Sequence, residues 1–276
     1  MIEVKNLNFR YRNHEVFHNL SLRFEEGKIY GLLGLNGEGK STLLYILSGL
    51  LKAKSGDVAI NGSCIARRLP SDLRNIYIVP EEFELPNMSL DKYVDINSVF
   101  YPKFSRETLA RCIKGFGIDI NARLGHLSMG QKKKALVCFA LATNTDILLM
   151  DEPTNGLDIP SKSQFRKVVS SCMTDERTII ISTHQVKDVE NLIDQIVILN
   201  QGNVALNRSA GEITGKLMFG MLKPMESNNG IIYRQPIIGG DAAVWTKQSG
   251  MQESPLDIEL LFNAVLSNPQ EINAIF

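Results

Sequence analysis

The stretch GLNGEGKST, residues 34–42, constrains the architecture of this chain more tightly than any other part of the sequence. It fits the pattern G-x-x-x-x-G-K-[ST], in which a glycine-rich loop binds phosphate where a strand passes into a helix. The flanking residues supply that context, because KIYGLLGL (28–35) predicts a buried strand and GKSTLLYILSGLL (39–51) predicts a helix. We therefore expect a phosphate-binding loop rather than an ordinary glycine-rich turn.

The side chains of this loop have distinct expected roles. Its glycines allow backbone N–H groups to converge on phosphates, which also meet the positive end of the following helix. Lys40 is expected along the β- and γ-phosphates, Ser41 on Mg²⁺ and Thr42 on a further phosphate oxygen. The candidate nucleotide-binding residues of the loop are Gly34, Asn36, Gly37, Glu38, Gly39, Lys40, Ser41 and Thr42.

Two further apolar runs end in polar residues, as strands do when they deliver side chains to a site at their carboxyl ends. The first run, DILLMDE (146–152), ends in Asp151, which can hold Mg²⁺ through water, and Glu152, which can polarise a water against the γ-phosphate. A carboxylate pair can also be a solvated turn, but the phosphate loop favours the catalytic interpretation. The second run, TIIIST (178–183), is followed by His184, whose position at a strand end indicates a γ-phosphate contact rather than a structural histidine.

The alternation of strand-like and helical segments predicts an α/β fold with a mostly parallel core sheet. Residues 195–206 predict a hairpin with a Gln-Gly-Asn turn. Residues 82–145 read as a helical insertion. Its helical segments are expected at 89–100, 105–117 and 128–142.

The sequence pattern changes after about residue 215, so we expect a main domain at 1–215 and a small α+β extension at 216–276. Residues 226–245 predict strands and turns, and SPLDIELLFNAVLSN (254–268) predicts a helix capped by Ser254 with Pro255 in its first position. The extension is either a dimer contact or regulatory element, or a brace that covers one edge of the core.

The composition excludes several classes of function. The 276 residues carry 30 basic and 30 acidic side chains, so no chain-wide positive field attracts nucleic acid. The amino end lacks the apolar core of a signal peptide and no window approaches a membrane span, so any membrane role must come from a partner. Cys64, Cys112, Cys138 and Cys172 lack metal-site spacing, which favours reduced thiols in a cytoplasmic protein.

With these motifs in order, residues 1–215 resemble the nucleotide-binding subunits of ATP-binding cassette (ABC) proteins. The resemblance implies the P-loop NTPase fold of ABC ATPases, with an additional N-terminal antiparallel β part, and ATP with Mg²⁺ as cofactors. It identifies Glu152 as the general base, His184 as a switch histidine and Asp158 as a contact to the opposite subunit. It also places Tyr11 on the adenine, although the bare sequence fits a strand residue equally well.

The resemblance also gives a role to LSMGQ (127–131). In the family this signature begins a helix and binds the γ-phosphate of an ATP held by another subunit, so that two chains enclose two ATPs head to tail. Ser128, Gly130 and Gln131 match the signature, and Met129 replaces the more frequent glycine. The three lysines at 132–134 are expected to lie mostly on a solvated face.

The chain departs from the family at Glu81, where a glutamine usually approaches Mg²⁺ and the attacking water. A carboxylate can still ligate the metal, but it adds negative charge beside the γ-phosphate. We expect Glu81 to be a metal-site residue, together with Ser41 and Asp151, that keeps the family's coupling of the site to the membrane partner and alters the kinetics of hydrolysis.

The motifs PEE (80–82) and FYPKF (100–104), together with the C-terminal extension, resemble bacterial exporter-type ABC ATPases. The expected function is an ATPase subunit, with Lys40, Glu152 and His184 as catalytic residues, that pairs with a like or unlike subunit and drives a separate membrane permease. It would lie at the inner face of the cell membrane without binding nucleic acid. The permease would meet the loop 81–86 at Phe83 and Leu85, unless these pack on the insertion itself. The rival function is a soluble ABC ATPase linked to cofactor assembly, nucleic acid or the ribosome.

Overall fold

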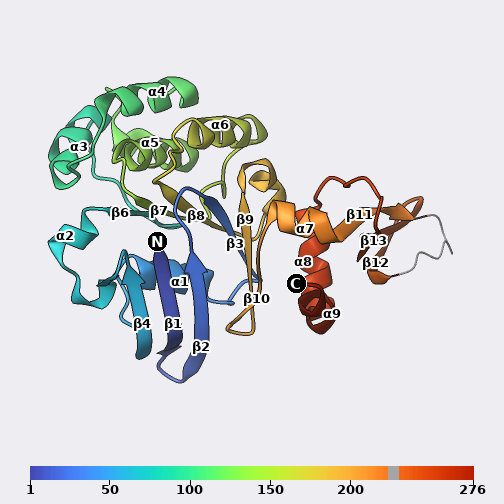
Figure 1. Ribbon diagram of the computed structural model, residues 1–276. Coiled ribbons are helices and arrows are strands. Elements are labelled where there is room, and N and C mark those ends of the chain that lie inside the picture. Colours follow the sequence, from blue (N-terminus) through green and yellow to red (C-terminus); the bar gives the residue numbers. More distant parts are fainter. Residues whose placement is uncertain (223–229) are drawn as a thin grey trace.

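The computed structural model describes residues 1–222 and 230–276, and residues 226–229 of the expected β segment lie outside this range. Three sheets organise the described chain, with strand orders β2-β1-β4-β5, β10-β9-β3-β8-β7-β6 and β11-β13-β12. Figure 1 shows the helical insertion at one end of the molecule, the first sheet at the other and the C-terminal extension to one side. Within the described ranges 1–222 and 230–276, no helix is long and apolar enough to cross a membrane.

The six-stranded sheet is the predicted mostly parallel core. Its strands are β3 (Ile29–Leu33), β6 (Ile76–Val79), β7 (Ile147–Asp151), β8 (Thr178–Thr183), β9 (Gln195–Asn200) and β10 (Asn203–Ser209). All pairs are parallel except β9 with β10, which form the predicted hairpin through Gln201 and Gly202 at φ of 49° and 72°. Strands β3, β7 and β8 are buried along their whole length, as expected when helices or a second sheet cover both faces.

The first sheet is the predicted N-terminal antiparallel part. It contains β1 (Ile2–Tyr11), β2 (His14–Phe24), β4 (Ser55–Ile60) and the short β5 (Ser63–Cys64). Helix α1 (Lys40–Leu47) shares a hydrophobic cluster with this sheet, since Leu43 and Leu44 are fully buried among residues of β1, β2 and β3. The helix that follows the phosphate loop is therefore held between two layers.

The helical insertion is confirmed on the other side of the core sheet (Figure 1). Its helices are α3 (Leu90–Asn97), α4 (Arg106–Phe116) and α5 (Met129–Ala142), and α6 (Ile159–Ser170) lies beside them. Ser89 and Ser105 cap α3 and α4 by accepting the backbone N–H groups of Lys92 and Thr108. Short helical turns occupy Ile65–Arg67, Pro70–Leu73 (α2), Ser98–Phe100, Leu124–His126, Val186–Asp188 and Glu190–Leu192.

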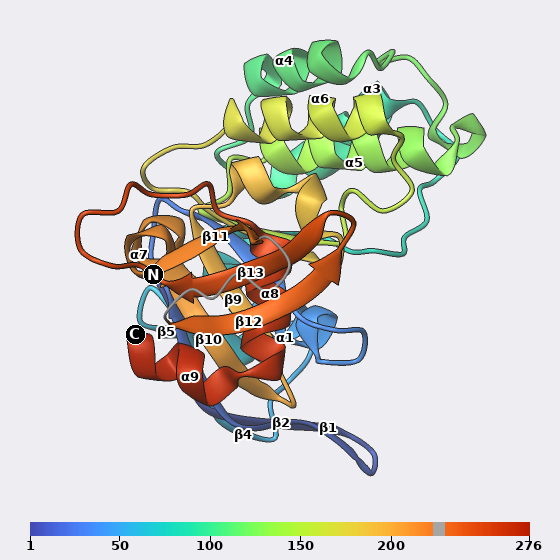
Figure 2. The same ribbon diagram turned by 90° about the vertical axis from the view of Figure 1, so that its right-hand side faces the viewer.

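The C-terminal extension has the predicted α+β character. It consists of α7 (Ala210–Lys216), β11 (Leu217–Leu222), β12 (Ile231–Ile237), β13 (Gly240–Thr246), α8 (Ile258–Ser267) and α9 (Pro269–Ile275). Figure 2 shows its three-stranded sheet in front of α8. Helices α8 and α9 contact β10, the edge strand of the core sheet, so the extension does cover one edge.

The predicted cap of the terminal helix is wrong. Helix α8 begins at Ile258, and its N-cap is Asp257, whose side chain accepts the N–H of Leu260 at 2.9 Å. The hydroxyl of Ser254 instead accepts the N–H of Phe219 at 2.8 Å. Ser254 therefore satisfies a backbone donor of β11, and residues 251–256 form neither helix nor strand before the carboxylate of Asp257 begins the helix.

Candidate nucleotide-binding site

The loop between β3 and α1 has the backbone that the phosphate-binding motif requires. Gly37 and Gly39 lie at φ of 89° and 90°, in the left-handed region that disfavours other residues. A Cβ on Gly39 would lie 2.6 Å from Val16 Cγ1 and 2.7 Å from Phe17 Cζ. Glycine at position 39 is therefore required both by its backbone angle and by the close approach of β2.

The loop borders a cavity of about 370 Å³ at the carboxyl end of β3. Its lining residues are Tyr11, His14, Val16, Asn36, Gly37, Gly39, Lys40, Ser41, Thr42, Glu81 and Glu152. The predicted residues among them come from β1, the loop with the start of α1, the segment after β6 and the position after β7. Gly34 and His184 line a second cavity that shares Asn36, and Asp151 lines neither cavity. Glu38 does not line this cavity; its backbone N–H donates to the carbonyl of Leu35 at 3.3 Å within the loop.

Lys40 is held against the loop that it follows. Its Nζ donates to the carbonyls of Gly34 at 2.8 Å and Leu35 at 3.1 Å, and the side chain is buried. Burial lowers the pKa of Lys40, while the carboxylates of Glu152 and Asp151 act in the opposite direction. An ammonium has three donors, so one N–H remains available for a phosphate oxygen.

Glu152 is held by the residue that follows β8. Its Oε1 accepts the backbone N–H of His184 at 3.0 Å and lies 2.8 Å from His184 Nδ1. Its Oε2 is buried with no hydrogen-bond partner among the described residues. One oxygen is therefore anchored, and the other is an unused acceptor that suits the proton of an attacking water.

The neighbouring strand end holds the second carboxylate. Asp151 is buried, and its Oδ1 accepts the hydroxyl of Ser182 on β8 at 2.5 Å. The Ser182 carbonyl in turn accepts the N–H of Glu152 at 3.1 Å. These contacts bring Asp151, Glu152 and His184 together at the carboxyl ends of two parallel strands.

Glu81, a predicted metal-site residue, lines the same cavity as Ser41. Its Oε1 accepts a hydrogen bond from Asn155 Nδ2 at 3.0 Å, which ties the segment after β6 to the turn after β7. Asn155 was not predicted. Its position three residues after Glu152 was the sequence feature that could have identified it as a site residue.

The donor set suits Mg²⁺. Ser41 and Glu81 line one cavity, and Asp151 is near enough to influence the charge of Lys40. All three supply oxygen, the donor that Mg²⁺ prefers, and this ion usually keeps waters and phosphate oxygens as its other ligands. Accordingly, the described residues contain no group of three His, Cys, Asp or Glu side chains that would hold a metal unaided.

Tyr11 lies at the mouth of the cavity. The residue is 45% exposed, and its ring packs edge-on against Phe9, with ring centroids 4.9 Å apart. Its hydroxyl is 3.3 Å from Thr42 Oγ1. An exposed ring anchored at both ends presents a face for a planar base.

The signature residues form the beginning of α5. Ser128 Oγ accepts the N–H of Gln131 at 3.3 Å, and Gln131 Oε1 accepts the N–H of Ser128 at 3.0 Å, which is a complete capping box. Ser128 and Gln131 are exposed, and neither they nor Gly130 line the Lys40 cavity among the described residues. Asp158 is also exposed and caps α6 by accepting the N–H of Ser161 at 2.9 Å.

The prediction that the three lysines mostly face solvent is wrong for Lys133. Its side chain is buried, and its Nζ donates to the carbonyls of Glu152 at 3.0 Å and Asn155 at 3.2 Å. Burial lowers its pKa, and Glu81 and Glu152 oppose that shift. Helical spacing could have predicted the burial of Lys133, since residues 133, 136, 137 and 140 share one face of the helix and the last three are apolar.

The other predicted contact surface is largely internal. Phe83 and Leu85 are partly buried against the hydrophobic cluster that includes the insertion helices, as the alternative interpretation required. The exposed apolar residues nearby are Ile96, Val99 and Phe100, at the end of α3 and in the turn that follows. The FYPKF motif begins with Phe100, so it was the sequence feature that could have indicated this exposed apolar surface.

The comparison with known proteins agrees with this site. The ABC transporter family model matches residues 17–155, which contain the phosphate loop, the signature and both strand-end carboxylates. The lantibiotic transport ATP-binding protein SrtF of Streptococcus pyogenes is 31% identical over 211 residues, covering 75% of this chain and 90% of the relative. The chain belongs to the ABC transporter family.

This ABC ATPase is also 29% identical over 236 residues to the energy-coupling factor transporter ATP-binding protein EcfA2 of Staphylococcus aureus, covering 77% of this chain and 81% of the relative. A solved structure described as "Structure of ATP binding subunit of ABC transporter" superimposes with a TM-score of 0.70 at 25% identity, over 78% of this chain and 92% of the other. The protein is an ATP-binding, ATP-hydrolysing subunit of the ABC family.

Proposed function

We propose that this ABC ATPase powers an exporter-type transporter as a head-to-tail pair, in which each ATP is held by Lys40 of one chain and the LSMGQ signature of the other. The observation that supports the pairing is the separation of these two phosphate-binding features. The signature is exposed at the start of α5 and does not line the cavity that contains Lys40. The N–H groups at the start of this helix remain suited to an anion supplied from outside the chain.

The same arrangement assigns the residues of hydrolysis. Lys40 and the loop N–H groups would hold the β- and γ-phosphates, and Tyr11 would stack on the adenine. Ser41, Asp151 and Glu81 would hold Mg²⁺, which when bound neutralises charge on the phosphates. Glu152 would accept the proton of the attacking water through its unused Oε2, while His184 holds Oε1 in place. Asp158, exposed at the start of α6, would face the other chain.

A mixing experiment tests the shared site. Lys40→Ala removes the phosphate lysine and Ser128→Arg blocks the signature, so each variant alone should hydrolyse little ATP. A mixture of the two allows pairs in which an intact Lys40 faces an intact Ser128. We expect the mixture to hydrolyse ATP faster than either variant, and a mixture no faster than its parts would contradict a site built from two chains.

The trapped state supplies the second test. Glu152→Gln should lower hydrolysis by about 100-fold or more, because general-base catalysis contributes that much. It should leave ATP binding intact and convert the chain from monomer to dimer when Mg²⁺-ATP is added, as measured by light scattering. Glu82→Gln, an exposed neighbour of Glu81, is the matched carboxylate control and should retain activity.

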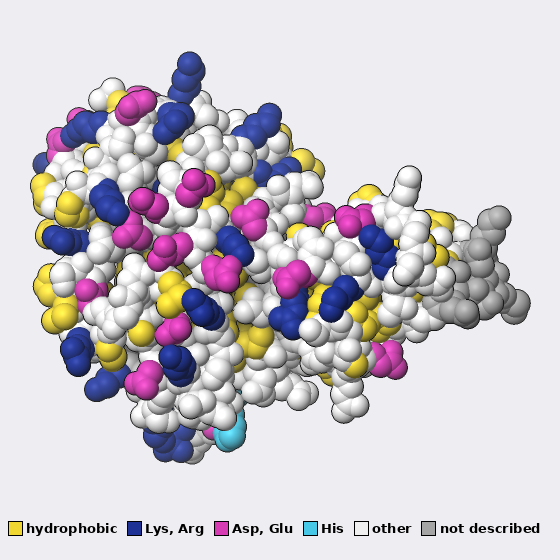
Figure 3. Space-filling view, viewed as in Figure 1, with side chains coloured by type: hydrophobic (Ala, Val, Ile, Leu, Met, Phe, Trp, Pro, Cys, Tyr) yellow, Lys and Arg dark blue, Asp and Glu magenta, His cyan; other side chains and the backbone are white. Residues whose placement is uncertain are grey.

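The membrane partner is the remaining part of the proposal. We propose that residues 1–215 form the cassette, that residues 216–276 extend it, and that a permease docks near Val99 and Phe100, which are 73% and 65% exposed. This places the protein at the inner face of the cell membrane. Figure 3 shows acidic and basic side chains interspersed over one face, an arrangement without a basic track for nucleic acid on that face.

Purification from detergent-solubilised membranes tests the partner. A multi-helix membrane protein should copurify with the wild type and be lost from Val99→Asp and Phe100→Asp variants that still hydrolyse ATP. Copurification with a nucleic acid or a soluble assembly factor instead would favour the soluble class of ABC ATPase.

A further inference from the structure

Two cysteines meet between the helical insertion and the core, away from the nucleotide-binding site. Cys112 lies on α4, and Cys172 follows the end of α6. Their Sγ atoms are 3.6 Å apart, although the residues are 60 positions apart in sequence. Both are free thiols, and Cys112 is fully buried.

The pair is polarised by its surroundings. Cys172 Sγ can accept hydrogen bonds from the Cys112 thiol and from Ser171 Oγ at 3.8 Å. The Cys112 hydrogen bond, the Ser171 hydrogen bond and the positive charges of Arg177 and Arg111 lower the pKa of Cys172. The same hydrogen bond and burial raise the pKa of Cys112. These surroundings favour the thiolate form of Cys172 and the protonated form of Cys112.

Arg177 supplies an unusual local charge. Its side chain is 3% exposed, and its guanidinium donates to the carbonyls of Ala140, Leu141 and Cys172 at 3.2, 3.1 and 3.4 Å. Its Nε has no hydrogen-bond partner in the described residues. The printed hydrogen bonds of this buried guanidinium go to neutral carbonyls, so its charge favours an anion nearby, and it lowers the pKa of Cys172.

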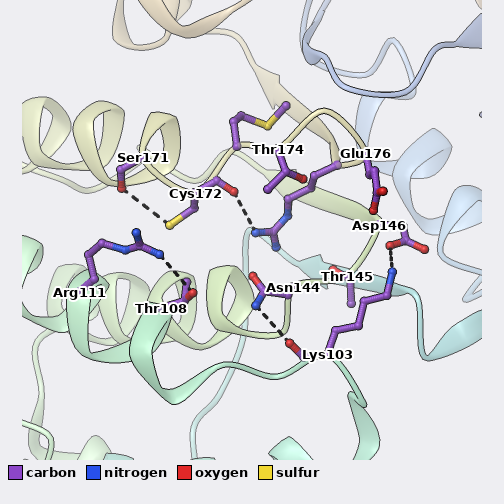
Figure 4. Close-up of a pocket in the computed structure, with 12 residues that line it drawn as sticks. Lys103, Thr108, Arg111, Asn144, Thr145, Asp146, Ser171, Cys172, Thr174 and Glu176 are labelled. Carbon is purple, nitrogen blue, oxygen red and sulfur yellow. Dashed lines mark hydrogen bonds and ion pairs between the residues drawn. The ribbon is translucent and has the colours of Figure 1, made fainter.

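A cavity leads from solvent to Cys172. It measures about 540 Å³, and Cys172 is among its lining residues, with Lys103, Thr108, Arg111 and Ser171. Figure 4 shows Arg111 and Thr108 projecting from α4 beside this cavity, with Cys172 and Ser171 across from them. Most residues of the lining have polar side chains and Cys172 is 6% exposed, so a small polar oxidant can reach Cys172, whereas Cys112 lies behind it at 0% exposure.

We propose that Cys172 and Cys112 are a peroxide-reactive pair that forms a reversible disulfide between α6 and α4. The Cys172 thiolate attacks one oxygen of hydrogen peroxide, the O–O bond breaks, and the departing oxygen leaves as water after taking a proton. Cys112 then loses its proton and attacks the sulfur of the Cys172 sulfenic acid, which releases its oxygen as the second water. The two thiols thereby lose two electrons and two protons, and one peroxide becomes two waters.

The product joins the helical insertion to the core. Cys112 belongs to the insertion, and Cys172 belongs to the segment that connects α6 to β8. A bond between them prevents α4 from shifting against the end of α6. The proposal is independent of the nucleotide site, because neither cysteine lines the Lys40 cavity.

Peptide mapping of the whole chain tests the pair. The protein is treated with one equivalent of hydrogen peroxide, its remaining thiols are blocked with a maleimide, and it is digested with trypsin. Cleavage after arginine and lysine places Cys112 in residues 112–114 and Cys172 in residues 168–177. We expect these two peptides joined, with a loss of two hydrogens, and separated again by dithiothreitol.

Cys64 is the internal control, because it is more exposed than Cys172 but has no thiol partner among the described residues. Cys64→Ser should form the same linkage at the same rate as the wild type. Cys112→Ser should stop at the sulfenic acid, which dimedone traps on peptide 168–177. The proposal is wrong if Cys64 is oxidised before Cys172, or if wild-type peptides 112–114 and 168–177 are not joined.

Discussion

Lys133 Nζ donates a hydrogen bond to the backbone carbonyl of Glu152 at 3.0 Å. The lysine lies on α5, five residues after Ser128, so the helix that begins with the signature also supports the catalytic carboxylate of its own chain. A change at the signature that shifts α5 along its axis would therefore move the backbone of Glu152. This contact offers a physical route by which the phosphate of one site influences hydrolysis at the other.

Lys133→Met tests this support. The substitution leaves two carbonyls without their buried donor, which costs about 1–3 kcal/mol for each unsatisfied group. Displacement of Glu152 should lower the turnover number by about tenfold or more with little change in the KM for ATP. Steady-state ATPase assays and thermal unfolding measure both effects.

Lys132→Met is the matched control for Lys133→Met, since Lys132 is more exposed and makes no such contact to the turn. It should retain wild-type turnover. Equal activity of the two variants would show that the buried lysine does not position Glu152.

Glu81→Gln tests the departure from the family pattern. The amide oxygen can keep the hydrogen bond from Asn155, while the negative charge beside the γ-phosphate is removed. We expect faster turnover, by about fivefold, because less negative charge opposes the developing charge on the leaving phosphate. We also expect half-maximal activity at a higher Mg²⁺ concentration.

A titration of ATPase activity against Mg²⁺ at saturating ATP measures both effects of Glu81→Gln. Glu82→Gln provides the control for a charge change in the same loop, because Glu82 is exposed. A Glu81→Gln variant with unaltered turnover and unaltered Mg²⁺ dependence would mean that Glu81 serves only to hold Asn155.

Two substitutions at Tyr11 distinguish the contribution of base stacking to ATP binding from that of the hydroxyl contact. Tyr11→Ala should weaken ATP binding by about tenfold, since stacking of a base on an aromatic ring is worth about 1–3 kcal/mol. Tyr11→Phe loses the contact with Thr42 but keeps the ring, so its ATP affinity should stay close to that of the wild type. Calorimetric titration with ATP measures both variants, and equal losses would assign the effect to the hydroxyl.

Phe262 decides between the two interpretations of the C-terminal extension. It lies on α8 and lines a cavity of about 220 Å³ together with Leu35, Asn36 and His184. If the extension regulates hydrolysis, Phe262→Ala should lower turnover several-fold with a small change in melting temperature. If it is only a brace, the melting temperature should fall while the folded protein keeps its turnover.

Phe276→Ala is the corresponding control for the extension. This terminal ring packs against Arg208 and Lys216, with their charged groups 5.5 and 5.1 Å from its centre, and does not line the His184 cavity. It should affect stability alone. The difference in turnover between Phe262→Ala and Phe276→Ala is the informative quantity.

The core of the site was predictable because its signals are local. The phosphate loop needs glycines at fixed spacing, and Asp151, Glu152 and His184 each lie at the end of an apolar run that predicts a buried strand. Since parallel strands end at the same edge of a sheet, the order of these motifs places them together without knowledge of the contacts. The helical insertion was predictable because its segments at 89–100, 105–117 and 128–142 favour helix locally.

Other features depend on which surfaces meet. Whether Lys133 or Lys132 is buried depends on the rotation of α5 against the turn after β7, and whether Ser254 caps a helix or bonds β11 depends on where the extension lies. The meeting of Cys112 with Cys172 requires α4 to pack beside the end of α6, and nothing in the spacing of the four cysteines indicates it. Local sequence thus specified the chemistry at the strand ends, because covalent spacing and strand direction suffice there. Packing between distant segments decided which lysine supports that chemistry and which thiols form a pair.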